Sequence, residues 1–134
     1  MWAVLVLTAF LFPDPVLTPG VVRQLTAEQV CSIRWGKDIR HITEKMKRHV
    51  CGAYKVKDCP GSKFEIDHLI SRELAGADDI LNLWPQPIAE ARIKDKIENF
   101  LHRQICSNKL SLRVVQKRIA KDWTQFIQTI SEAK

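Results

Sequence analysis

The sequence predicts an α+β fold in which helices precede and follow two short strands. Apolar residues recur at helical spacing in both halves of the chain, and capping residues stand before these runs. Between them, Phe64 to Ile66 alternates apolar and polar side chains, which is typical of a strand. With 134 residues, the chain is long enough for one domain with a modest core.

Two short helices are expected in the first half. Thr26, with Gln29 three residues later, forms a capping-box signature, so a helix should run from about 27 to 35 and stop at Gly36. Thr43 is a suitable N-cap for a second helix. The apolar stripe of this second helix contains Ile42, Met46, Val50 and Ala53.

The second half should contain the strands and two longer helices. After the strand at 64–66, a second extended piece is expected within 69–74, followed by a turn at 76–79. Two prolines within 84–87 should break the chain. A long helix then runs from about Ile88 to Cys106–Asn108, and Ser111 caps a last helix from Leu112 to about Ile130.

The first twenty residues differ in composition from the rest. Residues 2–12 are apolar, too short a run for a membrane-spanning helix of about 20 residues but suited to a secretory signal peptide. No Lys or Arg precedes this run and no clear cleavage motif follows it, so a buried strand or a misassigned start is the alternative. Prolines then form a linker up to Gly20, which leaves 21–134 as the domain.

Four cysteines bear on the same question. No pair has the spacing of a structural zinc site, and an even number in a small exported chain favours two disulfides, hence a secreted or periplasmic location. Three pairings are possible. Cys51–Cys59 closes a short turn and is geometrically easy, which leaves Cys31–Cys106. Four buried thiols in a cytosolic protein are the alternative.

The net charge of +6 favours polyanions such as nucleic acid or anionic lipid. Much of this charge falls in the first half of the chain. These basic side chains either contact phosphate or form a solvated helix surface, and both interpretations stay open. The residues concerned are Arg34, Lys37, Arg40, Lys45, Lys47 and Arg48.

The residues best suited to catalysis lie between Phe64 and Pro85. Asp67 and His68 are adjacent, and Asn82 follows fourteen positions after the histidine. Histidine is largely neutral at neutral pH and can deprotonate water, while a carboxylate oxygen suits a hard divalent cation. Side chains of neighbouring residues diverge in an extended backbone, so both could address one scissile phosphate. Asn82 could accept a hydrogen bond from the other imidazole nitrogen and fix its tautomer.

This pattern resembles the HNH endonucleases. Asp67, His68, Gly76 and Asn82 match the family motif, and the flanking segments IDHLI, NLWPQP and KDKIEN resemble a group of small, mostly bacterial HNH-like proteins. The resemblance covers about residues 19–126. It implies a mainly helical domain that encloses a ββα-metal core. It also implies that His68 is the general base, Asp67 a metal ligand, and Asn82 the residue that orients the base.

The chain departs from the family pattern at the third metal ligand. The expected histidine or asparagine position is Ala91, which cannot bind a metal. Asp95 is the first substitute, with Glu90 and Glu98 behind it. Two loop positions also differ, since Ser71 replaces a proline and Ala75 replaces the first glycine of a pair.

Other polar residues have less specific interpretations. Lys94 and Arg92 either hold a phosphate or form a solvated helix face. Asp78 is expected to be a turn residue, and His102 a surface residue without a partner pattern. Trp84 is expected in the core.

The resulting hypothesis is an exported nuclease that hydrolyses DNA, with RNA as the alternative substrate, and that uses one divalent metal ion, either Mg²⁺ or a transition metal. The alternative is a catalytically degenerate HNH fold that binds nucleic acid or a partner without cutting, which the alanine at position 91 favours. A third hypothesis is a disulfide-stapled secreted interaction protein whose charge is incidental.

Overall fold

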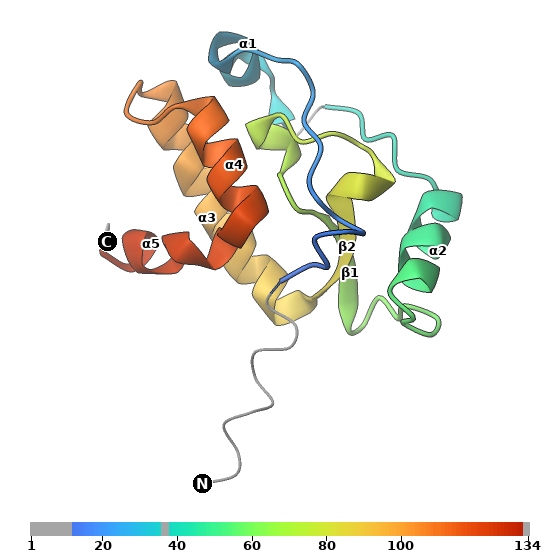
Figure 1. Cartoon of the computed structure of the whole chain (residues 1–134). Helices are drawn as coiled ribbons and strands as arrows, with labels where there is room; N and C mark the ends of the chain where they lie inside the picture. Colours follow the sequence, from blue (N-terminus) through green and yellow to red (C-terminus); the bar gives the residue numbers. More distant parts are fainter. Residues whose placement is uncertain (1–11, 36–37, 133–134) are drawn as a thin grey trace, which may run out of the picture.

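A two-stranded antiparallel sheet lies between helices on either side in the computed structural model, which describes residues 12–35 and 38–132 (Figure 1). Helix α2 covers one side of the sheet, and α3 and α4 run side by side on the other (Figure 1). The fold is therefore α+β, as predicted. The elements in chain order are α1 (Ala27–Ser32), α2 (Glu44–Ala53), β1 (Phe64–His68), the 3-10 turns η3 (Arg72–Leu74) and η4 (Ile80–Asn82), β2 (Leu83–Pro87), α3 (Ile88–Cys106), α4 (Leu112–Asp122), η5 (Trp123–Phe126) and α5 (Ile127–Glu132).

Both predicted N-caps of the first half are confirmed. The Thr26 hydroxyl accepts a hydrogen bond from the Gln29 backbone N–H, and the Gln29 side chain accepts one from the Thr26 N–H. Thr43 caps α2 by accepting from the Met46 N–H. Helix α1 ends at Ser32, earlier than predicted, because the backbone is already extended at Ile33. The predicted stop at Gly36 lies outside the described residues.

The second strand is not where the sequence predicted it. Strand β2 occupies the proline-rich segment 83–87, where a break was expected, and pairs with β1 so that Ile66 faces Pro85 and Phe64 faces Pro87. Proline lacks a backbone N–H, and a two-stranded sheet tolerates it because each strand has an edge that needs no partner. The segment 69–74, predicted to be extended, instead contains the short turn η3.

A tight loop between the strands requires glycine at position 76. A Cβ atom at Gly76 would lie 1.6 Å from the carbonyl oxygen of Ile70, so no other residue fits there without a backbone shift. The preceding Ala75 adopts a left-handed conformation with φ 65°, which glycine adopts at lower cost. The loop therefore holds Ala75 in a conformation that costs alanine more than glycine.

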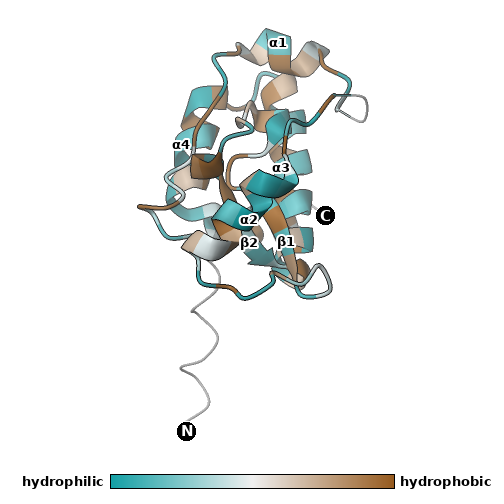
Figure 2. Ribbon diagram, turned by 90° about the vertical axis from the view of Figure 1, so that its right-hand side faces the viewer, coloured by the Kyte–Doolittle hydropathy of each residue, from teal (hydrophilic) through white to brown (hydrophobic). Residues whose placement is uncertain are grey.

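The main core lies where α3 and α4 meet the loop between the strands. It is centred on Leu74, Ile97, Leu101, Ile119 and Trp123. The last predicted helix is interrupted at Asp122, where the backbone is extended and the carboxylate accepts a hydrogen bond from the Thr124 N–H. Figure 2 shows α2 in front of the sheet, with hydrophilic residues on its outward surface.

Both predicted disulfides are confirmed. Cys31–Cys106 joins α1 to the end of α3, and Cys51–Cys59 closes the loop after α2. Two disulfides are compatible with an extracellular or periplasmic protein. Among the described residues, no helix has both the length and the apolar character needed to cross a bilayer.

The predicted export segment lies mostly outside the described residues, which begin at Phe12. The predicted linker contains neither helix nor strand, as expected. Its end nevertheless packs onto the domain, because the buried Thr18 hydroxyl lies 2.6 Å from the Tyr54 hydroxyl and donates to the Leu83 carbonyl. The Gly20 N–H also donates to the Leu81 carbonyl.

Candidate metal and hydrolytic site

Strand β1 directs Asp67 and His68 to opposite sides of the sheet, as an extended backbone requires. The Asp67 carboxylate faces α3, where its Oδ2 lies 3.5 Å from the Lys94 ammonium. The His68 ring faces the loop before η4, where its Nε2 lies 2.8 Å from Oδ1 of Asp78. The two residues therefore have separate surroundings and different partners.

Three carboxylates meet on the α3 side of the strand. Asp67, Asp95 and Glu98 each offer an oxygen, and these oxygens all lie within 4.8 Å of one another. Asp95 and Glu98 are one helical turn apart on α3, which brings both to the face that packs on β1. The structure thus brings the predicted ligand Asp67 together with Asp95 and Glu98, two of the predicted substitutes for the third ligand that Ala91 cannot supply.

Burial and repulsion between carboxylates raise the pKa values of Asp95 and Glu98. Burial raises the pKa of Asp95, and the negative charge of Asp67 raises it further. The pKa of the neighbouring Glu65 on β1 is also raised, mainly by burial and then by repulsion from Asp67 and Asp95. Burial raises the pKa of Glu98 to about 8, against the opposing attraction of Lys94. A cation held among these oxygens would relieve the repulsion.

Lys94 is buried within this group, so the prediction that it contacts phosphate is wrong for this conformation. Its side chain is 0% exposed, and its ammonium donates to the His68 carbonyl at 2.7 Å and to Glu98 at 3.1 Å. Burial lowers its pKa, but the attraction of Glu98 and Asp67 outweighs burial and the net shift is upward. Arg92, the other predicted phosphate contact, is exposed.

The polar groups around Asp67 leave hydrogen-bonding capacity for a metal ion. Asp67 Oδ2 is buried and makes no well-aligned hydrogen bond. Gln86 on β2 is 0% exposed, and both polar atoms of its amide lack a partner. Gln86 pairs with Glu65 across the sheet, so its side chain lies on the same face as Asp67. Oxygen ligands of this kind suit a hard divalent cation, and the residues present therefore fit one.

His68 is paired with a carboxylate that the sequence did not single out. Asp78 was predicted to be a turn residue, yet it accepts from His68 Nε2 and from the His41 backbone N–H. These bonds and the nearby Arg72 guanidinium outweigh burial and lower the pKa of Asp78. Burial lowers the pKa of His68, although the bond to Asp78 opposes this shift. His68 is therefore neutral at neutral pH, with its proton on Nε2 and its lone pair on Nδ1.

A chain of charged side chains holds Asp78 in place. The Arg72 Nε lies 3.1 Å from Asp78, and its Nη2 lies 2.8 Å from Asp38. Arg23 approaches the same Asp38 at 3.9 Å. Each of these side chains is at least partly buried, so solvent screens the contacts less than on an open surface.

Asn82 does not orient the His68 ring, so that prediction is wrong. Its side-chain oxygen accepts from the Ile70 N–H, and its amide donates to the carbonyls of Ile70 and Ala77. Asn82 is fully buried and fixes the loop that carries Asp78. Its effect on His68 is therefore indirect, through the shape of this loop.

The remaining predicted site residues lie apart from the acidic group. Ala91 is buried on α3 and offers no ligand atom. Burial raises the pKa of Glu90, whose oxygens do not join the three-carboxylate group. His102 has a partner, contrary to prediction, since it accepts a hydrogen bond from the Trp35 indole at 3.2 Å. It lies beside Cys31 and Cys106, but both sulfurs are committed to the disulfide.

Sequence reasoning missed Asp78 and Gln86 because no period or motif marks them. Asp78 follows His68 by ten residues through a loop, so its contact depends on the loop fold. Comparison with known proteins adds no assignment: no family model matches the chain, and neither does any curated protein or solved structure.

Proposed function

We propose that this chain is a divalent-metal-dependent endonuclease that hydrolyses phosphodiester bonds in nucleic acid, with DNA as the expected substrate. The observation that carries the proposal is the group of Asp67, Asp95 and Glu98 oxygens within 4.8 Å of one another. His68 follows Asp67 in β1, points to the other side of the strand, and has its Nε2 held by Asp78. The order of two antiparallel strands followed by α3 supports an HNH-like core.

Asp67, Asp95 and Glu98 would hold the metal ion, either Mg²⁺ or a transition metal. A divalent cation bound there would offset negative charge on the phosphate and on the leaving oxygen. The Lys94 ammonium already lies 3.5 Å from Asp67, so it would share that carboxylate with the ion and limit the net negative charge of the site. Gln86 would contribute an uncharged amide oxygen on the same face.

His68 would act as the general base. Asp78 accepts a hydrogen bond from His68 Nε2–H, which would leave Nδ1 able to take a proton from water. The lowered pKa of His68 keeps this nitrogen unprotonated at neutral pH. Because His68 is only 4% exposed, a phosphate would reach no more than the edge of the ring.

Arg40 is the basic residue near β1 that could meet a polyanionic substrate. It lines a hollow of about 530 Å³ beside the strand, together with Lys47, Glu44 and Glu65. Lys47 is paired with Glu44 at 3.2 Å. Arg40 is close enough to influence the pKa values of both His68 and Glu65. Arg40 is one of the first-half residues for which the sequence left phosphate contact and a solvated surface as alternatives, whereas Lys45 and Arg48 do not line this hollow.

Nicking of supercoiled plasmid tests the proposal. Wild type should nick in the presence of Mg²⁺ or Mn²⁺ and stop on addition of EDTA. His68→Ala should lose at least 10²-fold in rate, the usual loss when a general base is removed. His49→Ala, which removes an exposed histidine from α2, is the matched control and should retain full activity. Full activity in His68→Ala with the fold retained would end the assignment.

A second candidate is a catalytically inactive module that binds nucleic acid or a partner. The burial of the Lys94 ammonium between Asp67 and Glu98 favours it, because the lysine already supplies a positive charge there. Binding of plasmid by wild type without nicking under any divalent metal would select this candidate.

The proposed location is the cell exterior or the periplasm. Two disulfides form and persist in oxidising compartments and are rare in the cytosol. Detection of the oxidised protein in a periplasmic or secreted fraction would support this location. Fully reduced protein confined to the cytosol would contradict it.

A further inference from the structure

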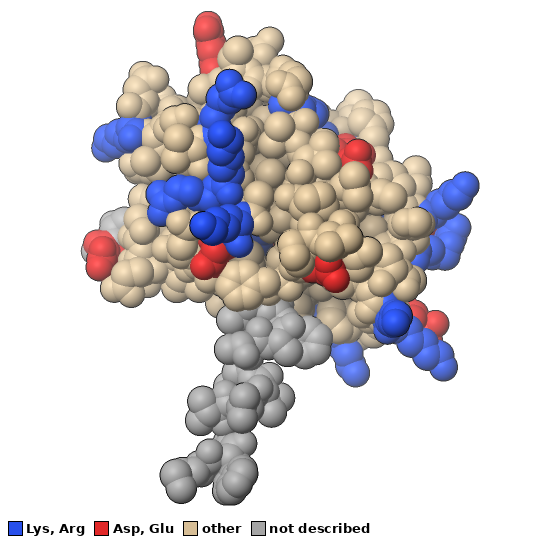
Figure 3. Space-filling view, in the orientation of Figure 1, with Lys and Arg blue, Asp and Glu red and all other residues tan. Residues whose placement is uncertain are grey.

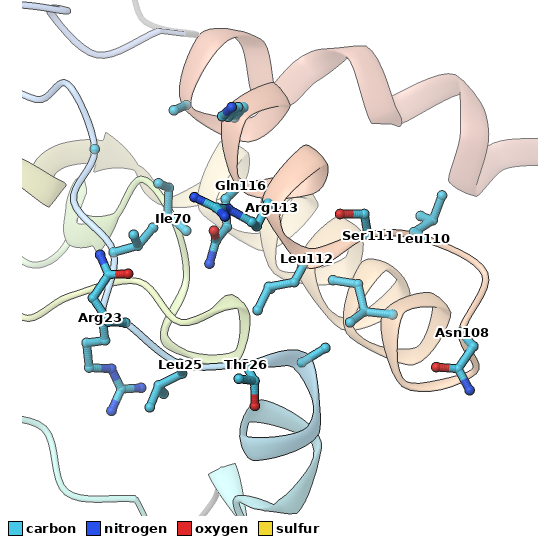
Figure 4. Close-up of a pocket in the computed structure, with 17 residues that line it drawn as sticks. Arg23, Leu25, Thr26, Ile70, Asn108, Leu110, Ser111, Leu112, Arg113 and Gln116 are labelled. Carbon is cyan, nitrogen blue, oxygen red and sulfur yellow. The ribbon is translucent and has the colours of Figure 1, made fainter.

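A groove on the opposite side of the core from α2 has no role in the site described above. It measures about 690 Å³ and lies between residues 20–27 and α4. Its apolar lining includes Ile105, Ile70 and Leu112. Figure 4 shows Ile70 and Leu112 on facing sides of the groove. Neither His68 nor any of the three clustered carboxylates lines it. Its size falls within the range of ligand-binding clefts.

The charged residues that line this groove are all basic. Arg23, Arg113 and Lys117 contribute to the wall, and no Asp or Glu does. Figure 4 shows Arg113 extending from α4 towards Ile70, whereas the guanidinium of Arg23 points away from the groove. Arg23 is also near Asp38, at 3.9 Å, so Arg113 and Lys117 supply the charge that a ligand would meet.

The basic wall continues along α4. Lys121 follows Lys117 by four residues, as Lys117 follows Arg113, so the three cations are spaced by roughly 6 Å along the helix. Figure 3 shows Lys and Arg side chains gathered in a column over α4. Within the described part of the chain, these three residues form no ion pair. An extended row of unpaired cations suits a polyanion better than a single charged group.

We propose that this groove binds the phosphate backbone of duplex nucleic acid, away from the bond that is cut. Guanidinium and ammonium groups contact phosphate, and the amides and hydroxyls of Gln24, Asn108 and Ser111 can reach sugar or phosphate oxygens. Among the described residues, no aromatic ring lines the groove, so unpaired bases have no ring there on which to stack, which disfavours a single strand. An anionic membrane is also disfavoured, because the cations line a concave wall and not a protruding apolar face. The inference rests on the proposed nuclease function.

Equilibrium binding of a fluorescent DNA duplex in EDTA tests the groove independently of cutting. R113Q/K117Q should weaken binding roughly 60-fold at 0.1 M salt and reduce the slope of log K against log salt by about 1.8, because two phosphate contacts are lost. K45Q/R48Q removes two exposed charges from α2 and is the matched control. The control pair should retain the wild-type slope. All four positions are exposed, so both variants should keep the wild-type melting temperature.

Three outcomes would overturn the groove assignment. Equal losses in both double variants would show a general charge effect, and a loss confined to the α2 pair would place the nucleic acid on α2. Unchanged DNA binding in the groove variant, with weakened binding to anionic phospholipid vesicles, would assign the groove to a membrane. Failure of the proposed nuclease function is distinguishable, since wild type would then bind the duplex without nicking plasmid in any divalent metal.

Discussion

Replacement of Lys94 by methionine should destabilise the domain strongly. Lys94 is fully buried, and its ammonium contacts the His68 carbonyl, Glu98 and Asp67 at 2.7, 3.1 and 3.5 Å. Methionine preserves much of the side-chain volume but leaves a buried carboxylate without its cation. Removing one partner of a buried ion pair typically costs about 3–5 kcal/mol. Burial raises the pKa of Glu98 to about 8 with Lys94 in place, and loss of Lys94 raises it further, so Glu98 takes up a proton in the variant and we expect the lower end of this range.

A second variant separates the loss of the ion pair from the loss of packing. Lys94→Met combined with Glu98→Leu replaces the pair by apolar groups and should return the free energy of unfolding to within about 1 kcal/mol of wild type. Urea unfolding at pH 8, monitored by tryptophan fluorescence, measures both variants. A single variant that loses less than about 1 kcal/mol would refute the assigned ion pair. So would a double variant that is as unstable as the single one.

Three further changes test other parts of the structure. Asn82→Ala should lower the unfolding free energy by about 3 kcal/mol, because three backbone groups lose their hydrogen-bond partner. The control Asn99→Ala, at an exposed position, should change it little. Equal effects of the two substitutions would contradict the role of Asn82 in fixing the loop. Removing the Cys31–Cys106 disulfide, which spans 75 residues, should lower the unfolding free energy by about 4.5 kcal/mol, and removing Cys51–Cys59, which spans 8 residues, should lower it by about 2.5 kcal/mol. A larger loss for Cys51–Cys59 in thermal or urea unfolding would contradict an origin in loop-closure entropy. Burial, and then repulsion from Asp95, raises the pKa of Glu73 from 4.5 to about 7, so the folded state holds this proton more tightly and stability falls as pH rises through that interval. Glu73→Gln should therefore match wild type at pH 4 and exceed it by about 1 kcal/mol at pH 8, since solvent screens part of the cost; a stability difference that does not change with pH would disprove the shift.

Much of the fold could be predicted because helix caps and apolar periodicity depend on residues that are close together in the sequence. The caps at Thr26 and Thr43 and the bounds of α3 follow from side-chain chemistry and helical period. The disulfides follow from an even cysteine count and one short loop. The second strand was missed because its two prolines argue against a strand, and only the two-stranded sheet removes that objection.

The candidate site was predicted only where it depends on short spacings. Asp95 and Glu98 were proposed as substitutes for the missing ligand, and both lie beside Asp67. The spacing along α3 does indicate that Lys94 is buried. Lys94 lies three residues after Ala91 and four before Glu98, so all three share the buried face of the helix. Lys94 was nevertheless predicted to be at the surface, because lysine is rarely buried.

The partner of His68 could not be predicted from spacing. Asn82 was assigned to the imidazole by its fourteen-residue separation, but the loop places it against Ile70. Asp78 reaches His68 instead, with Arg72 behind it. These contacts depend on a loop whose shape is set by long-range hydrogen bonds, which no local pattern encodes.

A calorimetric titration with Mn²⁺ tests the central claim most directly. Wild type should bind one ion per chain, and Asp67→Asn should lose at least about tenfold in affinity, because an anionic ligand becomes neutral. Glu132→Gln, which neutralises an exposed carboxylate near the end of α5, should bind like wild type. Equal Mn²⁺ affinity in wild type and Asp67→Asn, or no binding to either, would contradict a metal site formed by Asp67, Asp95 and Glu98.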